Sequence, residues 1–323
     1  MRLLLIPALL IGIAFAQSPL SSPARVDVVR VNEFYRLNTQ LGNRIWPRLG
    51  DAPDPLLLVT NNEEFLTRHP SPPNGFTKID DEFYARPRQF PTSLLATFPA
   101  FGPPSVIVIG EPENTDAKTS TPWLFTVMHE HFHQLQDSQP GLFAATESLG
   151  LAHGDRTGMW MLNYPFPYDK PEIARSFAHL RDLLLTALTE SDPQLFARKA
   201  ELYKEARRAF VAQLSPDDVK YFSFQLWKEG IARYVQVKSA EAAAHYQPTT
   251  EFAALPDYEP FDKFAAHARA DTIAELRRAD LPSWKRTVVY PFGACEGFLL
   301  DRINPNWRDS YFNNLFTLDP YFR

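Results

Sequence analysis

Residues 123–136 read Trp-Leu-Phe-Thr-Val-Met-His-Glu-His-Phe-His-Gln-Leu-Gln and contain the pattern H-E-x-x-H. On a helix, side chains four positions apart project from the same face, so His129 and His133 can bind one metal ion together. Glu130 lies about 100° further round the helix, close enough to take a proton from a water molecule activated by that metal. The stretch therefore predicts the metal-binding helix of a zinc hydrolase.

The third histidine of the stretch, His131, allows a second interpretation. Alternating histidines also fit a β-strand with three imidazoles on one side, as in the metal sites of barrel-type enzymes. Helical periodicity in the rest of the chain favours the helix, with Thr121 as its N-cap and Pro122 at its first position. On a helix, His131 points about 200° away from His129, and we expect it to be a buried, hydrogen-bonded side chain instead of a ligand.

A catalytic zinc ion usually has three protein ligands and one open position, so a further ligand must come from elsewhere in the chain. The best candidate is Glu229, in the segment 224–236 that reads FQLWKEGIARYVQ. The small residues Gly230 and Ala232 would let this second helix approach the histidine helix closely enough for a carboxylate to reach the metal. Two other acids, Glu147 and Asp155, are alternative third ligands, because they follow the histidine helix at shorter spacing.

The pattern E-G-x-A-x-Y that begins at Glu229 resembles the second metal-binding helix of the gluzincin peptidases, especially the aminopeptidase-N-like group. This resemblance implies that His129, His133 and Glu229 bind Zn²⁺. It covers two short helices and one later element, and the segment between His133 and Glu229 is far longer than in the best-known members, which implies a helical insertion. The H-x-x-G-x-x-H extension typical of metzincins is absent, since Gln139 stands at its last position.

The later element is Tyr290 with Gly293, which resembles a Tyr-x-x-Gly element of aminopeptidase-N-like enzymes. In those enzymes the tyrosine hydroxyl stabilises the oxyanion of the tetrahedral intermediate, so the resemblance implies the same role for Tyr290. Phe292 stands where the family usually has lysine. Tyr234 is a second candidate donor, but it lies about 140° from Glu229 round a helix and is expected to face away.

Together these residues predict a zinc-dependent hydrolase, and more specifically a metallopeptidase that acts on peptide or protein substrates with Glu130 as general base. The resemblance further implies that the strand directly before the histidine helix, 105–109, is an edge strand that pairs with extended substrate. Two alternatives stay open: a zinc hydrolase with a non-peptide substrate, and a non-catalytic zinc-binding protein whose closed metal shell includes His131.

Residues 1–16, MRLLLIPALLIGIAFA, have the basic start, apolar run and small-x-small end of a secretory signal peptide. We therefore expect an exported protein, periplasmic or extracellular. The apolar run is too short to span a membrane, and no other segment is apolar enough. Cys295 is the single cysteine, so it is expected to be a buried free thiol. The net charge of −5 without a basic cluster argues against a nucleic-acid partner, whereas the oligomeric state is left open.

The pattern of elements predicts an α+β fold, with a small N-terminal sheet followed by a mostly helical body and a zincin-like active-site cleft between them. We expect one catalytic domain over 17–323, with an α/β part at 17–140 and a helical part at 141–323. The segment 153–171, rich in aromatic residues and proline, is expected to be a packed loop. The expected strands are 56–60, 94–98 and 105–109, and the expected helices are 31–46, 171–190, 193–214, 216–244 and 261–279.

Overall fold

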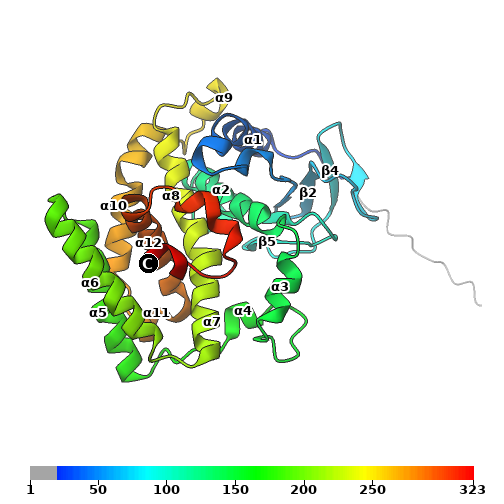
Figure 1. Cartoon of the computed structure of the whole chain (residues 1–323). Coiled ribbons are helices and arrows are strands. Elements are labelled where there is room, and N and C mark those ends of the chain that lie inside the picture. The colour runs from blue at the N-terminus through cyan, green and yellow to red at the C-terminus, as the bar shows by residue number, and fades with distance from the viewer. Residues whose placement is uncertain (1–19) are drawn as a thin grey trace, which may run out of the picture.

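A computed structural model describes residues 20–323, and the expected signal peptide at 1–16 lies outside the described residues. The described chain has a small six-stranded sheet at its N-terminal side and a larger helical body (Figure 1). This arrangement confirms the predicted α+β class. Among residues 20–323, no helix combines the length and apolar character needed to cross a bilayer.

The sheet is mixed, with strand order β3-β4-β2-β1-β6-β5. Its strands are β1 (Leu56–Val59), β2 (Glu63–Thr67), β3 (Thr77–Lys78), β4 (Phe83–Pro87), β5 (Leu95–Phe98) and β6 (Val106–Gly110). β1 and β6 are parallel and fully buried, as expected for apolar strands that are covered on both faces. β1, β5 and β6 match the predicted strands, whereas β2, β3 and β4 were not predicted.

The edge strand differs from the expectation. β6, the strand directly before the histidine helix, lies between β1 and β5 and is therefore internal. β5 forms the edge of the sheet, pairs antiparallel with β6 and is partly exposed along its length. The prediction that 105–109 is an edge strand is therefore wrong, and β5 is the strand on this side of the sheet whose backbone groups have a free side.

The helical elements form most of the remaining chain. The α-helices are α1 (Arg25–Ile45), α2 (Ser120–Asp137), α3 (Leu142–Ser148), α4 (Trp160–Asn163), α5 (Pro171–Leu188), α6 (Pro193–Val211), α7 (Pro216–Gln225), α8 (Ile231–Ala243), α9 (Thr250–Ala253), α10 (Phe261–Arg278), α11 (Leu281–Trp284) and α12 (Val289–Ile303). Shorter turns include η1 (Leu49–Asp51), η2 (Pro112–Asn114), η4 (Lys285–Val288), η5 (Trp307–Asn313) and η6 (Asp319–Phe322), and η3 (Leu226–Gly230) is a π-helix.

Helix α2, which contains the histidines, connects the sheet with the helical body. It contacts β5 and β6 on one side and α8 on the other (Figure 1). Its start differs from the prediction, because the helix begins at Ser120 and Thr119 is the N-cap residue. Thr121 lies inside the first turn, where its hydroxyl bonds to the backbone of Glu259. Pro122 is tolerated in this first turn because the amides there have no intrahelical partner.

The single helix predicted over 216–244 is interrupted by the π-helix η3. A π-turn inserts an extra residue into the helical repeat, and such insertions are frequent at functional sites. Glu229 lies within this wider turn. The interruption was not predictable from apolar periodicity, because α7 and α8 on either side continue the same helical pattern.

Helix α12 was not predicted, since Pro291, Gly293 and Gly297 all weaken a helical pattern. Pro291 falls in the first turn, where it is tolerated. A Cβ on Gly293 would lie 2.5 Å from Gly230 Cα, so the two glycines allow α12 and η3 to cross in close contact. This finding corrects the expected role of Gly230, which packs against α12 instead of the histidine helix. It also ties Glu229 and Tyr290 to one helix crossing.

The buried core continues from the sheet into the helical body. One apolar cluster includes Trp46 at the end of α1, Phe132 of α2 and Tyr311 near the C-terminus, whose rings contact one another. The segment 153–171, expected to be a packed loop, contains the short helix α4 and is mostly exposed or half-buried, although Phe166 is buried and Tyr164 stacks on Tyr221 of α7 at a centroid distance of 4.4 Å. Cys295 is a buried free thiol, as predicted.

Two acidic side chains, Asp27 of α1 and Glu111 after β6, lie beside each other near the start of α2. Asp27 is buried, and its Oδ1 accepts a hydrogen bond from Arg30 Nη1 at 3.0 Å. Burial raises the pKa of Asp27 despite Arg30, and burial together with the charge of Asp27 raises the pKa of Glu111 from 4.5 to about 7. The pair therefore holds a proton at pH values where an exposed glutamate has lost it.

The raised pKa of Glu111 predicts that the stability of the folded protein depends on pH. Because the folded pKa is raised, its stabilising contribution is present below pH 4.5 and is lost as the pH rises through about 7. We expect the stability of Glu111→Gln relative to the parent to increase by about 1 kcal/mol between pH 4.5 and pH 8. This value allows for the partial exposure of Glu111. Chemical denaturation across this range tests the effect, with the exposed Glu147→Gln as control. Parallel stability curves for parent and Glu111→Gln would contradict it.

Candidate metal centre

Three potential ligand atoms converge at the face of α2 that meets η3. His129 Nε2 and His133 Nε2 are 3.2 Å apart. Glu229 Oε2 lies 3.7 Å from His129 Nε2 and 3.3 Å from His133 Nε2. His129 and His133 are buried, and 18% of the Glu229 side chain is exposed, so the group can be reached from outside.

The spacing of these atoms fits a tetrahedral zinc ion. Ligand bonds of about 2.0–2.1 Å at tetrahedral angles place the ligand atoms about 3.3 Å apart. The observed separations of 3.2, 3.3 and 3.7 Å agree with this value. Glu130 also lies close, because one of its carboxylate oxygens is within 4.8 Å of a nitrogen of each histidine. The tighter triangle formed with Glu229 favours that residue as the third ligand and leaves Glu130 beside the site.

Local structure explains why these side chains meet. The two histidines are one turn apart on α2, which aligns their rings along one face. Glu229 is supplied by η3, and the close contact of Gly230 with Gly293 sets the position of that segment against α12. The sequence thus supplies the histidine pair locally, and the crossing of two later helices supplies the carboxylate.

The electrostatic balance of the group suits a cation. Burial lowers the pKa of His129, and its hydrogen bond with Glu229 only partly offsets that effect. Burial also lowers the pKa of His133, but the negative charge of Glu229 outweighs burial and raises it. Burial raises the pKa of Glu229, yet the two histidines outweigh it and hold that pKa well below its usual range. Glu229 is therefore ionised, as a metal ligand must be.

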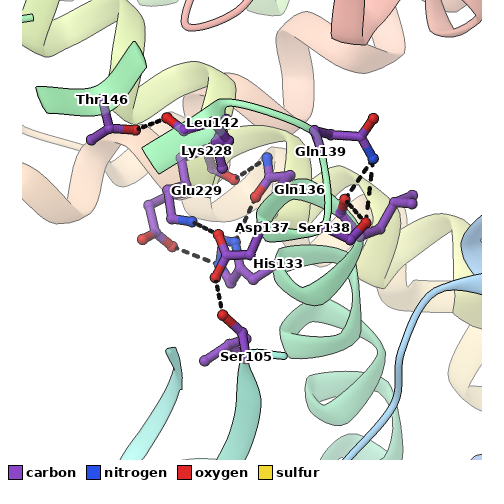
Figure 2. A network of polar contacts seen from close by, with 12 residues as sticks. Ser105, His133, Gln136, Asp137, Ser138, Gln139, Leu142, Thr146, Lys228 and Glu229 are labelled. Carbon is purple, nitrogen blue, oxygen red and sulfur yellow. Dashed lines mark hydrogen bonds and ion pairs between the residues drawn. The ribbon is translucent and has the colours of Figure 1, made fainter. Parts of the chain in front are cut away.

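Gln136 orients His133. Its Oε1 lies 2.7 Å from His133 Nδ1, and its Nε2 donates to the backbone oxygens of Trp227 at 3.2 Å and Lys228 at 3.3 Å (Figure 2). The amide nitrogen also contacts Tyr311 Oη at 2.9 Å. Because the amide nitrogen faces acceptors, the amide oxygen faces His133, whose Nδ1 must carry the proton. The lone pair of Nε2 then points toward the metal centre.

This role of Gln136 predicts a loss of metal affinity on substitution. Gln136→Met removes the acceptor for His133 Nδ1 and the link to η3, and we expect zinc to bind about 10–100-fold more weakly. Competition with a chromogenic chelator measures the change. Gln139→Met, on the next turn of the same chain segment, is the matched control and should bind zinc like the parent. Unchanged zinc affinity in Gln136→Met would show that Gln136 does not orient His133 for metal binding.

A second link joins η3 to the end of α2. Lys228 Nζ lies 3.0 Å from Asp137 Oδ1, and Asp137 Oδ2 accepts a hydrogen bond from Ser105 Oγ at 2.7 Å (Figure 2). Lys228 and Asp137 are largely buried. This chain of contacts runs from the residue before Glu229 to the residue directly before β6, and it links the sheet, α2 and η3 around the candidate site.

Glu130 is held by the edge strand. Thr97 Oγ1 of β5 lies 2.8 Å from Glu130 Oε2 and 3.0 Å from the Glu130 backbone oxygen. A hydroxyl that donates to one carboxylate oxygen leaves the other oxygen available to accept a proton. Thr97 was not identified from the sequence, because the antiparallel pairing of β5 with β6 brings it to α2 across a large separation along the chain.

Tyr290 lies beside the histidine pair of α2. Its ring centroid is 6.1 Å from that of His129. Burial and the nearby charge of Glu229 raise the pKa of Tyr290, and Arg286 only partly opposes them. The phenol therefore stays protonated at neutral pH and can donate a hydrogen bond. Arg286, whose Cζ is 5.3 Å from the Tyr290 ring centroid, is a second residue that the sequence did not reveal.

Other candidates lie outside the group. His131 is fully buried, with Nδ1 2.8 Å from Gln134 Oε1 and Nε2 2.9 Å from the backbone oxygen of Leu49, which confirms that it points away. Tyr234 donates to Asp301 at 2.8 Å, as expected for a residue that faces away from Glu229.

The alternative third ligands are also placed elsewhere. Asp155 accepts hydrogen bonds from the backbone nitrogens of Thr157 and Trp160, both at 2.7 Å, and so caps the turn before α4. Glu147 is exposed on α3. Neither belongs to the group of potential ligands around His129 and His133, whereas Glu229 does approach both histidines.

A cavity of about 430 Å³ lies beside the C-terminal end of α2. It is lined by Pro53, Pro99, Pro103, Pro104, Ser105, Gln134, Asp137, Ser138 and Phe143. The Gln134 amide and the Asp137 carboxylate already bond to other parts of the protein, so the wall is mainly apolar in character. Pro99 directly follows β5, which places the cavity at the end of the edge strand.

Comparisons of the chain with models of known protein families, with curated proteins and with solved structures gave no significant match.

Proposed function

We propose that the protein is an exported zinc-dependent hydrolase that cleaves peptide bonds. The observation that supports this most is the convergence of His129 Nε2, His133 Nε2 and Glu229 Oε2 at separations suited to tetrahedral zinc. A bound zinc ion would supply a Lewis acid that polarises the scissile carbonyl and lowers the pKa of water toward 7. The remaining steps depend on side chains of this chain.

Glu130 is the general base. Its carboxylate accepts a proton from the attacking water and transfers it to the leaving amine, while Thr97 keeps one of its oxygens oriented. Tyr290, protonated at neutral pH, donates a hydrogen bond to the oxyanion that develops on the former carbonyl oxygen. These residues come from three different elements, α2, β5 and α12.

The edge strand β5 supports a peptide as the substrate. Its free side offers backbone donors and acceptors beside Glu130, and an extended peptide can pair with them. The mainly apolar cavity after Pro99 lies further along the same strand and would receive an apolar side chain of that peptide. A rigid non-peptide substrate would make no use of the strand edge.

A peptide-library digest with mass-spectrometric detection tests the proposal. The zinc-loaded protein is expected to cleave peptides, to lose activity with a chelator and to regain it with zinc. Zinc bound without cleavage of any peptide, but with hydrolysis of esters, would favour a non-peptide substrate. Zinc held in a closed four-ligand shell, with neither activity, would favour a non-catalytic binding protein.

A further inference from the structure

Arg286 is a cation at the candidate metal centre that neither the zinc ligands nor the general base requires. It lies in η4, one turn before Tyr290, and its Cζ is 5.3 Å from the Tyr290 ring centroid. Its Nη1 has one hydrogen-bond contact, with Gln225 Oε1 at 3.4 Å. The Gln225 amide in turn donates to the backbone oxygen of Met161 at 2.7 Å, which fixes this wall of the site.

Arg286 differs from the buried arginines of the described chain. Arg30, Arg86 and Arg207 each form an ion pair with a carboxylate, at 3.0 Å or less. Within residues 20–323, Arg286 forms no ion pair with a carboxylate, although its side chain is partly buried. Burial lowers its pKa, but Tyr290 and Glu229 outweigh that effect, so the guanidinium remains charged. Apart from its contacts with Gln225 and the Tyr290 hydroxyl, its five N–H donors are available to a ligand.

The backbone before Arg286 is held in an unusual conformation. Lys285 has φ 48° and ψ −127°, a region that non-glycine residues rarely adopt. The Lys285 side chain is exposed, so its own contacts do not explain the strain. This residue joins α11 to η4 and turns the chain so that Arg286 comes next to Tyr290. Strained residues of this kind persist where the surrounding structure fixes a functional side chain.

We propose that Arg286 binds a carboxylate of the substrate, so that the enzyme prefers peptides with a negative charge close to the scissile bond. This inference rests on the proposed peptidase function and names its substrate class. The planar guanidinium matches a carboxylate in bidentate geometry.

The geometry limits where the carboxylate lies. The Tyr290 ring is 6.1 Å from that of His129 and 5.3 Å from Arg286 Cζ. An extended peptide advances about 3.4 Å per residue, so the carboxylate belongs to a residue within about three positions of the cleaved bond. A free C-terminus and an aspartate or glutamate side chain both supply this group.

Matched peptide pairs test the proposal in the zinc-loaded enzyme. One pair differs by a free or amidated C-terminus, and a second pair, amidated, differs by aspartate or asparagine near the cleaved bond. We expect the parent enzyme to prefer the charged member of at least one pair, and the pair that responds identifies the source of the carboxylate. Arg286→Gln should lose about 10–100-fold in kcat/KM on that charged peptide, mainly through KM, and little on its neutral partner.

Lys285→Gln is the matched control, because it removes the same unit charge one residue away from an exposed position, and it should retain the preference. An equal loss on charged and neutral peptides in Arg286→Gln would overturn the proposal and point to a role through Tyr290. Absence of any preference in the parent enzyme would also overturn it while leaving the peptidase function intact.

Binding separates this proposal from the hydrolytic function. Calorimetry with zinc-loaded Glu130→Gln and the same peptides measures recognition without turnover. Tighter binding of the charged peptide that is lost in the Glu130→Gln, Arg286→Gln double variant supports the carboxylate site even if no peptide is cleaved. Equal binding of both peptides, or no binding of either, overturns it.

Discussion

Glu130→Gln is expected to retain zinc and to lose peptide hydrolysis by about 10²–10⁴-fold, the contribution that a positioned general base typically makes. Glutamine keeps the shape of the side chain and one oxygen for the Thr97 hydroxyl, which lies 2.8 Å from Glu130 Oε2. It cannot accept a proton at neutral pH. Because the proposed ligand atoms belong to His129, His133 and Glu229, the substitution should leave the proposed metal centre intact.

Two measurements on the same preparation decide this prediction. Elemental mass spectrometry should give the same zinc content for parent and variant, and steady-state assays should show the decrease in kcat. Glu147→Gln, on the exposed face of α3, is the control and should keep full activity. Full activity in Glu130→Gln would refute the mechanism, since no other described carboxylate meets both histidines except the ligand candidate Glu229.

Glu229→Ala should bind zinc far more weakly than the parent protein, which is expected to hold about one zinc per chain. Loss of a hydrogen-bond partner to a ligand weakens zinc sites by about 10–100-fold, and loss of the ligand itself should exceed that range. Glu229 Oε2 is within 3.7 Å of both histidine nitrogens, so alanine leaves only a histidine pair. His133→Ala should have the same effect and lose activity as well.

The rival acids serve as controls for Glu229. Asp155→Ala and Glu147→Ala remove carboxylates that the sequence also offered as ligands, but both lie outside the group around the histidines. Zinc content should remain near the parent value in both variants. Retention of zinc in Glu229→Ala together with loss in Asp155→Ala would move the third ligand to the loop before α4. Absence of zinc in the parent, even after refolding with the metal, would remove the metal centre altogether.

The local sequence accounts for much of the candidate site. The spacing of His129 and His133 requires only a helix, and the apolar residues around them form one. Glu229 was found because its small neighbours and following tyrosine resemble a known helix. The helices α5, α6 and α10 were located within a few residues, since each has a long apolar stripe.

Several features could not be predicted from the local sequence, because their cause lies in another part of the chain. β2, β3 and β4 contain charged residues and lack the continuous apolar run of β1 and β6, so their pairing depends on partners across the sheet. The edge position of β5 follows from the strand order, which no single strand encodes. α12 contains Pro291, Gly293 and Gly297, which disfavour a helix locally, but Gly293 is required by the close contact with Gly230 of η3.

The sequence alone therefore establishes which side chains on α2 share a face, because that depends on the 3.6-residue helical repeat and on adjacent residues. It cannot establish that Thr97 meets Glu130, that Gln136 fixes His133 to η3 or that Tyr290 lies beside His129. Those pairs join segments that are far apart along the chain. They are brought together when the chain buries a shared apolar core. Burial of apolar surface is non-directional, so it favours many arrangements until the whole chain has packed.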